Sequence, residues 1–124
     1  MSGVSRVFMA LGAVLAALSV ALSAAAAHVP ALQAAGATFS ASLEMQQLHA
    51  LGLLLVGLAH ARHPSRWLLV SGGLMLLGQL LFCLNIDVRL LWGWDQARAL
   101  VPWGGSAFML AWLALAVGVF TPER

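Results

Sequence analysis

A few polar side chains that could take part in chemistry interrupt an otherwise apolar sequence: His28, Glu44, Gln46, Gln47 and His49. Imidazole and carboxylate groups can carry protons, and histidine together with carboxylate also suits zinc. Ionisable groups that lie at membrane depth are costly and are often functional. One hypothesis is therefore a proton-handling or solute pathway, or a metal site, formed by His28, Glu44 and His49.

The same side chains could instead be structural. On a helix, Glu44 and Gln47 lie on one face and Gln46 and His49 on another, so they do not converge by themselves. Glu44 near a helix N-terminus is also favoured by the helix dipole. The alternative is a hydrogen-bonded network that joins two helix ends. We predict no catalytic residue, cofactor or metal, and one candidate polar cluster of His28, Glu44, Gln47 and His49.

The elements that must position these residues follow from the composition. Hydrophobic residues make up 62% of the 124 and charged residues only 8%, against roughly 45–50% and about 25% in an ordinary soluble domain. Too few polar residues are present to coat a soluble core, so we expect lipid to surround much of the chain. The six basic residues are all arginines and are scattered, which predicts no nucleic-acid surface.

Apolar runs near the length of about 20 residues that crosses a bilayer occur at residues 7–27, 43–61, 67–84 and 100–120. Continuous apolar runs favour helices, because strands of a membrane barrel alternate apolar and polar residues. The prediction is an all-α integral membrane four-helix bundle, formed by one transmembrane domain over residues 1–124. The polar start of the second run makes it the least regular of these spans.

The arginines predict the orientation. Four helices would place on one side Arg6, Arg62, Arg66 and Arg124, and on the other Arg89 and Arg98. By the positive-inside rule, this four-to-two distribution favours both termini in the cytoplasm. The first run, with its small residues before His28, also resembles a signal peptide, but it is longer than the usual 7–15-residue apolar core.

Two other features suggest contacts with partners. Small residues recur on one face of the first run and of the last, and such faces allow close helix packing. The connection over residues 85–99 holds Trp92 and Trp94 among charges, and we expect residues 90–94 to form a re-entrant turn or a short interfacial helix. Either the small-residue faces or this loop could bind a second copy or a larger membrane complex.

The last run opens with a distinctive set of residues: Pro102, Gly104, Gly105, Phe108 and Trp112. Proline in the first turn and adjacent glycines favour a helix start with close packing. This set resembles the Pro-x-Gly-Gly signature of a family of small bacterial inner-membrane proteins, domain of unknown function 423, which is related to eukaryotic transmembrane protein 256.

Two further segments carry the same resemblance: the pair Ala27-His28, and the opening of the second run, Leu43-Glu44-x-Gln46-x-x-His49. The chain looks like a divergent member, since it has no tyrosine and a longer third connection. The resemblance implies a four-helix protein with an uncleaved first span, but it implies no reaction.

Catalytic signatures such as a nucleophile elbow, a phosphate loop or a Cys-x-x-Cys pair are absent from the sequence. We therefore expect a non-enzymatic structural or accessory component of the membrane or of a larger membrane complex. The alternative is a small channel, transporter or proton-linked protein that uses the polar cluster at the non-cytoplasmic end of the first two helices.

Overall fold

The computed structural model describes residues 1–121, and these residues form helices and turns without a strand. The long helices are α1 (Gly3–Ala25), α3 (Ala37–Arg62), α4 (Arg66–Gly78) and α6 (Val101–Gly118). Shorter elements are α2 (Pro30–Ala35), the π-helix η1 (Gln79–Leu84), α5 (Asn85–Trp92) and the 3₁₀-helix η2 (Arg98–Leu100). The predicted all-α class is confirmed.

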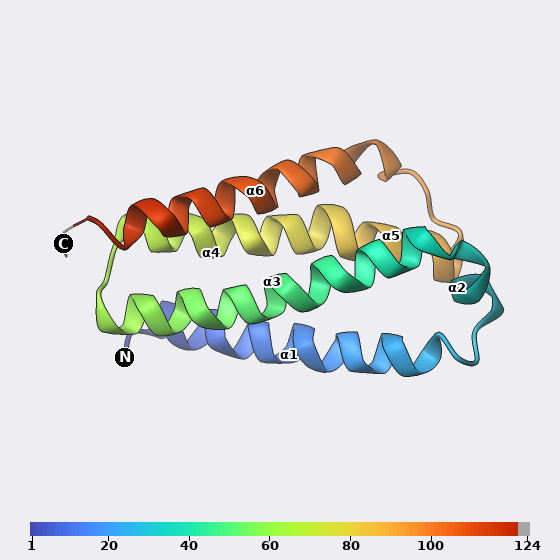
Figure 1. Cartoon of the computed structure of the whole chain (residues 1–124), viewed down its shortest axis with the longest axis horizontal. Coiled ribbons are helices and arrows are strands. Elements are labelled where there is room, and N and C mark those ends of the chain that lie inside the picture. Colours follow the sequence, from blue (N-terminus) through green and yellow to red (C-terminus); the bar gives the residue numbers. More distant parts are fainter. Residues whose placement is uncertain (122–124) are drawn as a thin grey trace.

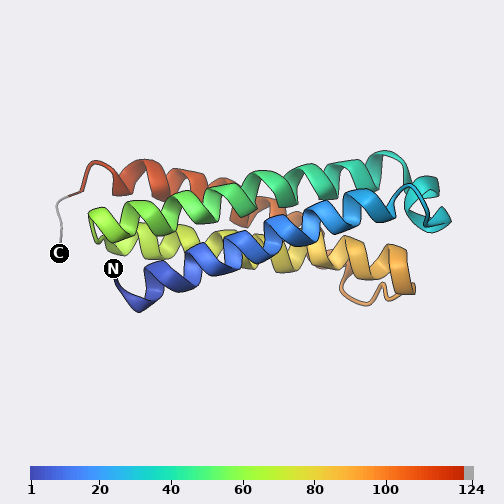
Figure 2. The ribbon, with the colours of Figure 1, turned by 90° about the horizontal axis from the view of Figure 1, so that it is seen from below.

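The helices lie side by side in an elongated molecule (Figures 1 and 2). α1 packs along α3, α4 packs along α6, and α3 also contacts α4. α4, η1 and α5 follow one another without a break and form one rod, named here the third rod. The start of α1 and the end of α6 lie at one end of the molecule, while α2 and α5 lie at the other (Figure 1).

By length and apolar composition, three of the described helical segments can cross a membrane: Gly3–Ala25, Arg66–Trp92 and Arg98–Gly118. These segments correspond to the first, third and fourth predicted spans and indicate a membrane protein. α3, which contains the second predicted span, is the longest helix with 26 residues. It is not among the three, because its polar side chains lower its mean hydropathy.

The connections differ from the prediction. Residues 28–42, expected as a loop, contain α2 and the first turns of α3. The third rod continues to Trp92, so residues 90–92 are the last turn of α5 and the expected re-entrant turn is wrong. This rod ends where Gly93 adopts a left-handed φ of 73° and its N–H bonds to the Arg89 carbonyl. Glycine is the residue best suited to that helix-ending conformation.

Buried apolar side chains of all the long helices meet in one core, which includes Phe8 of α1, Leu53 of α3, Met75 of α4 and Ala111 of α6. Glycines let the helices approach closely. A Cβ on Gly12 would lie 2.8 Å from the Ala50 carbonyl oxygen, so α1 rests directly on the backbone of α3.

Candidate functional site

The structure separates the predicted polar cluster into two groups. His28, Glu44 and Gln47 are exposed, whereas His49 is buried. Within residues 1–121, no hydrogen bond or ion pair joins any of these four side chains to another of the four, and no three His, Cys, Asp or Glu side chains gather as metal ligands would. The exposed face of α3 and its buried face are the two stripes that the spacing predicts.

His49 is held by three neighbours. Its Nδ1 lies 2.7 Å from the Met45 carbonyl oxygen, and its Nε2 accepts a hydrogen bond of 2.9 Å from Trp112 Nε1. The Phe108 ring stacks on the imidazole with centroids 3.6 Å apart. A carbonyl only accepts and an indole N–H only donates, so the ring is a neutral imidazole protonated at Nδ1. Both ring nitrogens are occupied, which leaves none for a metal.

Two of these neighbours, Phe108 and Trp112, belong to the predicted helix-packing motif. Its glycines play different roles: a Cβ on Gly104 would lie 2.7 Å from the Phe82 backbone nitrogen, whereas a Cβ on Gly105 would meet nothing within 4 Å. Pro102 lies in the first turn of α6. The motif therefore packs α6 against the third rod and places Phe108 and Trp112 beside His49. Neither the helix-packing motif nor the predicted polar cluster indicates this contact by itself.

Buried polar side chains of the third rod face buried polar side chains of α3. We name these residues of both helices together the polar seam. Its members are buried and lie on α3, η1 and α5: Ser42, Gln46, Gln79, Cys83 and Asp87. The Ser42 hydroxyl lies 3.3 Å from both the Cys83 carbonyl oxygen and Asp87 Oδ1, and Gln79 Nε2 donates to the Gln46 carbonyl at 3.1 Å. The seam thus connects the two helices through several polar contacts.

Some oxygens of the polar seam have no hydrogen-bond donor. Within the described residues, Gln46 Oε1, Gln79 Oε1 and Asp87 Oδ2 are buried without a partner. Buried polar atoms are nearly always paired, and each exception calls for an explanation. Asp87 also forms no ion pair with a residue in this range. A carboxyl group that lies 5% exposed without a cation is the strongest chemical feature of the seam.

The backbone beneath the seam is unusual as well. Gln79 and Cys83 lie on the π-helix η1. In a π-helix the backbone N–H groups bond to carbonyls five residues earlier, one residue further than in an α-helix. π-Helical turns are rare and frequently occur at functional sites. The wider turn places the Cys83 carbonyl oxygen within reach of the Ser42 hydroxyl.

Gln79 and Asp87 are functional candidates that the sequence patterns do not predict. Asp87 was expected in a loop, because the run of apolar residues ends at Leu84. The spacing of four residues from Gln79 to Cys83 and from Cys83 to Asp87 was the available indication, since it keeps all three on one helical face. This spacing indicates a shared face only if the helix continues past Leu84.

A comparison with known families matches residues 22–105 to the family described as "Protein of unknown function (DUF423)". The matched range is more than half of the chain and contains the polar seam, His49 and the first part of the helix-packing motif. No solved structure matches the chain.

Proposed function

The chain belongs to the DUF423 family of proteins of unknown function, and from this premise we propose that it is a non-enzymatic accessory protein of the bacterial inner membrane. It crosses the membrane four times, as a bundle of α1, α3, the third rod and α6, with both termini in the cytoplasm. The family membership supports the resemblance drawn from the sequence and adds no activity.

The single observation that carries this proposal is the polarity of α3. After the exposed Glu44 and Gln47, its outward stripe continues with leucines that have large exposed fractions, 48%, 59%, 55% and 49%, at Leu48, Leu51, Leu55 and Leu58. Its inward stripe holds Ser42, Gln46 and His49, all buried. A helix at a water interface has the opposite arrangement. The leucine stripe suits lipid, and hydrogen bonds inside the bundle satisfy many of the inward polar atoms.

An insertion assay tests the fourth span. Replacing Leu55 by Arg should reduce membrane insertion of α3, since an arginine at a helix centre costs about 2.5–3.5 kcal/mol. The matched control is Thr38→Arg, at an exposed position in the first turn of the same helix, where we expect little change. Equal insertion of Leu55→Arg and the parent chain, in a reporter of each helix's translocation, would contradict the four-span arrangement.

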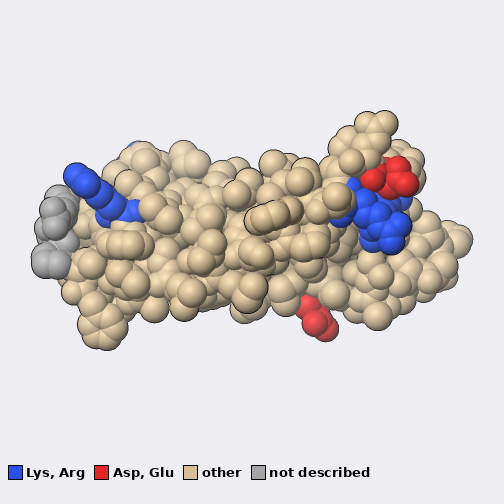
Figure 3. All heavy atoms as spheres, turned by 90° about the horizontal axis from the view of Figure 1, so that it is seen from above, with Lys and Arg blue, Asp and Glu red and all other residues tan. Residues whose placement is uncertain are grey.

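Charged and aromatic side chains also fit two membrane interfaces. Figure 3 shows arginine side chains gathered toward the two ends of the molecule, with the middle largely uncharged. Exposed tryptophans lie near both ends, Trp67 at the start of α4 and Trp92 and Trp103 at the opposite end. Tryptophan prefers the interface between lipid and water, so the uncharged middle corresponds to the hydrocarbon region.

Support for an accessory role comes from a small-residue row on α1. Ala13, Ala17 and Ala21 are exposed, and their spacing of four residues allows a second helix to approach closely. The corresponding small residues of α6 are buried against the third rod instead. The row on α1, or the end of the third rod with Trp92 and the following Trp94, would therefore contact another copy or a larger membrane complex.

Purification in a gentle detergent tests this role. We expect an oligomer or a co-purifying membrane complex, which Ala17→Leu should weaken by enlarging the row. Val14→Leu, at an exposed position of α1 outside the row, is the matched control. A monomer that purifies alone from membranes would contradict the accessory role and leave the four-span arrangement intact.

A proton- or cation-linked protein is the second candidate, and Asp87 favours it. A buried carboxyl group with a free oxygen inside a membrane-crossing segment is a functional candidate by its cost alone. The relevant measurement is the flux of protons and alkali cations in proteoliposomes. We expect Asp87→Asn to abolish any such flux and Asp95→Asn, at an exposed position, to preserve it. Equal fluxes in both variants would remove this candidate.

A further inference from the structure

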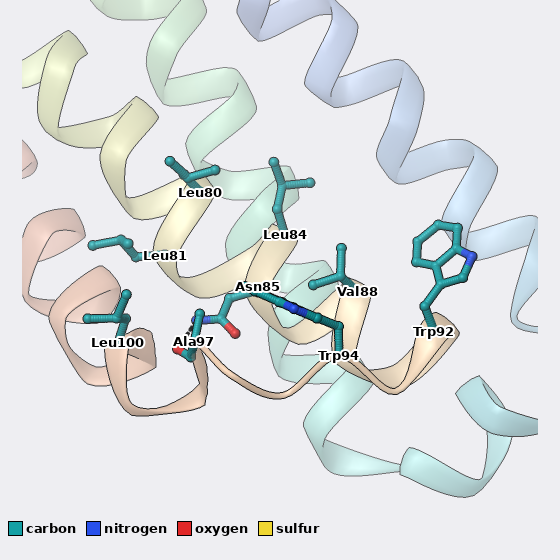
Figure 4. Close-up of a pocket in the computed structure, with 9 residues that line it drawn as sticks. All are labelled: Leu80, Leu81, Leu84, Asn85, Val88, Trp92, Trp94, Ala97 and Leu100. Atoms are coloured by element: carbon teal, nitrogen blue, oxygen red, sulfur yellow. Dashed lines mark hydrogen bonds between the residues drawn. The ribbon is translucent and has the colours of Figure 1, made fainter.

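An apolar groove lies between the third rod and the segment that returns to α6 (Figure 4). Its volume of about 530 Å³ falls in the range of about 300–1,000 Å³ typical of ligand sites. One wall is a row at four-residue spacing, Leu80, Leu84, Val88 and Trp92. The opposite wall comes from the segment that returns to α6 and includes Trp94 and Ala97.

One polar side chain, Asn85, lines this groove. Its Nδ2 donates a hydrogen bond of 2.6 Å to the Ala97 carbonyl oxygen, and this bond identifies the other amide atom as the oxygen. Asn85 is 5% exposed, and its Oδ1 has no partner among the described residues. An apolar groove with an unpaired, buried acceptor in its lining residue Asn85 suits an amphiphile with a hydrogen-bond donor.

Positive charge borders the groove. Arg98 directly follows Ala97, and Arg89 lies one helical turn beyond Asn85 on the same face. Asp95 is the exposed acidic residue of this region, and Figure 3 shows acidic and basic side chains together at this end. Within residues 1–121, neither arginine forms an ion pair. Two arginines against one exposed carboxylate leave a net positive rim, which attracts an anionic group.

We propose that this groove binds one phosphatidylglycerol molecule. An acyl chain lies along the row from Leu84 to Leu80, the phosphate lies beside Arg98, and a glycerol hydroxyl of the headgroup donates to Asn85 Oδ1. This lipid combines the three chemistries that the groove presents: an apolar chain, one negative charge and hydroxyl donors. The inference rests on the proposed membrane location, because it takes its ligand from the surrounding bilayer.

Native mass spectrometry of the full chain, released from nanodiscs of phosphatidylglycerol in phosphatidylcholine, tests the proposal. We expect one retained phosphatidylglycerol per chain. Ala97→Trp should lower its retention about tenfold, equivalent to roughly 1.4 kcal/mol, because the indole fills the groove. Ala99→Trp is the matched control: Ala99 lies two residues further on, is exposed in η2 and is not a lining residue, and retention should stay unchanged.

A charge variant keeps the test informative if Ala97→Trp does not fold. Arg98→Gln should reduce retention of phosphatidylglycerol but not of phosphatidylethanolamine, while Arg66→Gln, at the other end of the molecule, should change neither. Equal retention by Ala97→Trp and the parent chain would overturn the proposal. So would equal retention of both lipids by the parent chain, or a dimer that covers the groove and excludes lipid.

Extraction with alkaline carbonate separates this inference from the proposed function. A chain that alkali removes from membranes would refute the membrane-spanning proposal itself. A chain that stays in the membrane but retains no phosphatidylglycerol would refute the groove assignment alone.

Discussion

At the scale of the residue, His49 illustrates how an imidazole can be buried without being reactive. The Met45 carbonyl and the Trp112 indole occupy its two nitrogens, and Phe108 covers one ring face. The carbonyl can only accept a hydrogen bond and the indole N–H can only donate one, so the role of each ring nitrogen is fixed. His49 therefore joins α3 to α6 as a structural element, while the exposed His28 and Glu44 lie outside this network.

Substitution of Trp112 tests that structural role. Trp112→Phe keeps an aromatic ring but removes the donor to His49 Nε2, and an unsatisfied buried acceptor costs about 1–3 kcal/mol. We expect a lower thermal midpoint in detergent, measured by circular dichroism. Trp103→Phe, at a position 67% exposed, is the control and should leave the midpoint unchanged. Equal midpoints in the two variants would mean that the Trp112 bond contributes nothing to stability.

The two adjacent glycines of α6 provide a second test at this scale. A Cβ on Gly104 would collide with the backbone of Phe82, whereas Gly105 faces open space. Gly104→Ala should destabilise the fold by about 1–3 kcal/mol through overpacking. Gly105→Ala should be neutral or stabilising by up to about 1 kcal/mol, because alanine is the better helix former. Unfolding in denaturing detergent would compare them, and similar values for both would contradict the close approach of α6 to the third rod.

At the scale of the element, the π-helix η1 is the feature with the largest effect on the polar seam. It lies inside a segment that is long and apolar enough to cross a membrane, and it carries Gln79 and Cys83. The Ser42 hydroxyl of α3 lies within hydrogen-bonding distance of both the Cys83 carbonyl and Asp87. One hydroxyl donates only one hydrogen bond at a time, so Ser42 stabilises either the irregular backbone or the carboxyl group.

Replacing this serine tests the connection between α3 and the π-helix. Ser42→Ala removes the donor and should cost about 1–3 kcal/mol, because a buried acceptor then loses its hydrogen bond. Ser40→Ala is the matched control, since Ser40 is exposed on the same helix. Hydrogen exchange of residues 79–87 is the measurement. Faster exchange there in Ser42→Ala alone is expected, and unchanged exchange would show that η1 is stable without α3.

Some elements could be predicted from the sequence because a local pattern determines them. The apolar runs placed α1 and α6 closely, and Pro102 marked the first turn of α6. The C-terminal end of the third rod could not be predicted from a local pattern. Its last turns carry Asn85 and Asp87, whose polar side chains find partners on α3 and on the returning segment. A tertiary contact, which no local pattern encodes, lets the helix continue.

The candidate site was only partly predictable for a related reason. The spacing separated Gln46 and His49 from Glu44 and Gln47, and the structure has the first pair buried and the second exposed. Which stripe faced inward depended on the neighbouring helices. The pairing of Gln46 with Gln79 joins residues 33 positions apart, and a single sequence carries no sign of such a pairing.

At the scale of the whole molecule, the distribution of polarity is the reverse of that in a soluble bundle. Leucines cover much of the outside of α3, and buried serine, glutamine and aspartate side chains line its contact with the third rod. Without a hydrophobic driving force in lipid, such helices associate through close packing and hydrogen bonds. The glycine contacts of α1 with α3 and of α6 with the third rod provide the first, and the polar seam provides the second.

The orientation of the molecule in the membrane yields the last prediction. α1 starts and α6 ends at the same end of the molecule (Figure 1), which also carries Arg6, Arg62 and Arg66. Arg124, the fourth arginine counted on that side, lies outside the described residues. Replacing both Arg62 and Arg66 by Gln reduces the four-to-two excess to two against two, so we expect a mixed orientation.

Fusions of the C-terminus to a cytoplasm-active and to a periplasm-active reporter would measure this orientation. The parent chain should activate only the cytoplasmic reporter, and the double variant should activate both. The matched control replaces Arg89 and Arg98 by Gln, which raises the excess to four against none and should preserve the parent orientation. A parent chain that activates the periplasmic reporter would contradict a cytoplasmic C-terminus. It would place the polar rim of the groove on the cytoplasmic leaflet, where anionic lipid is attracted by the same arginines.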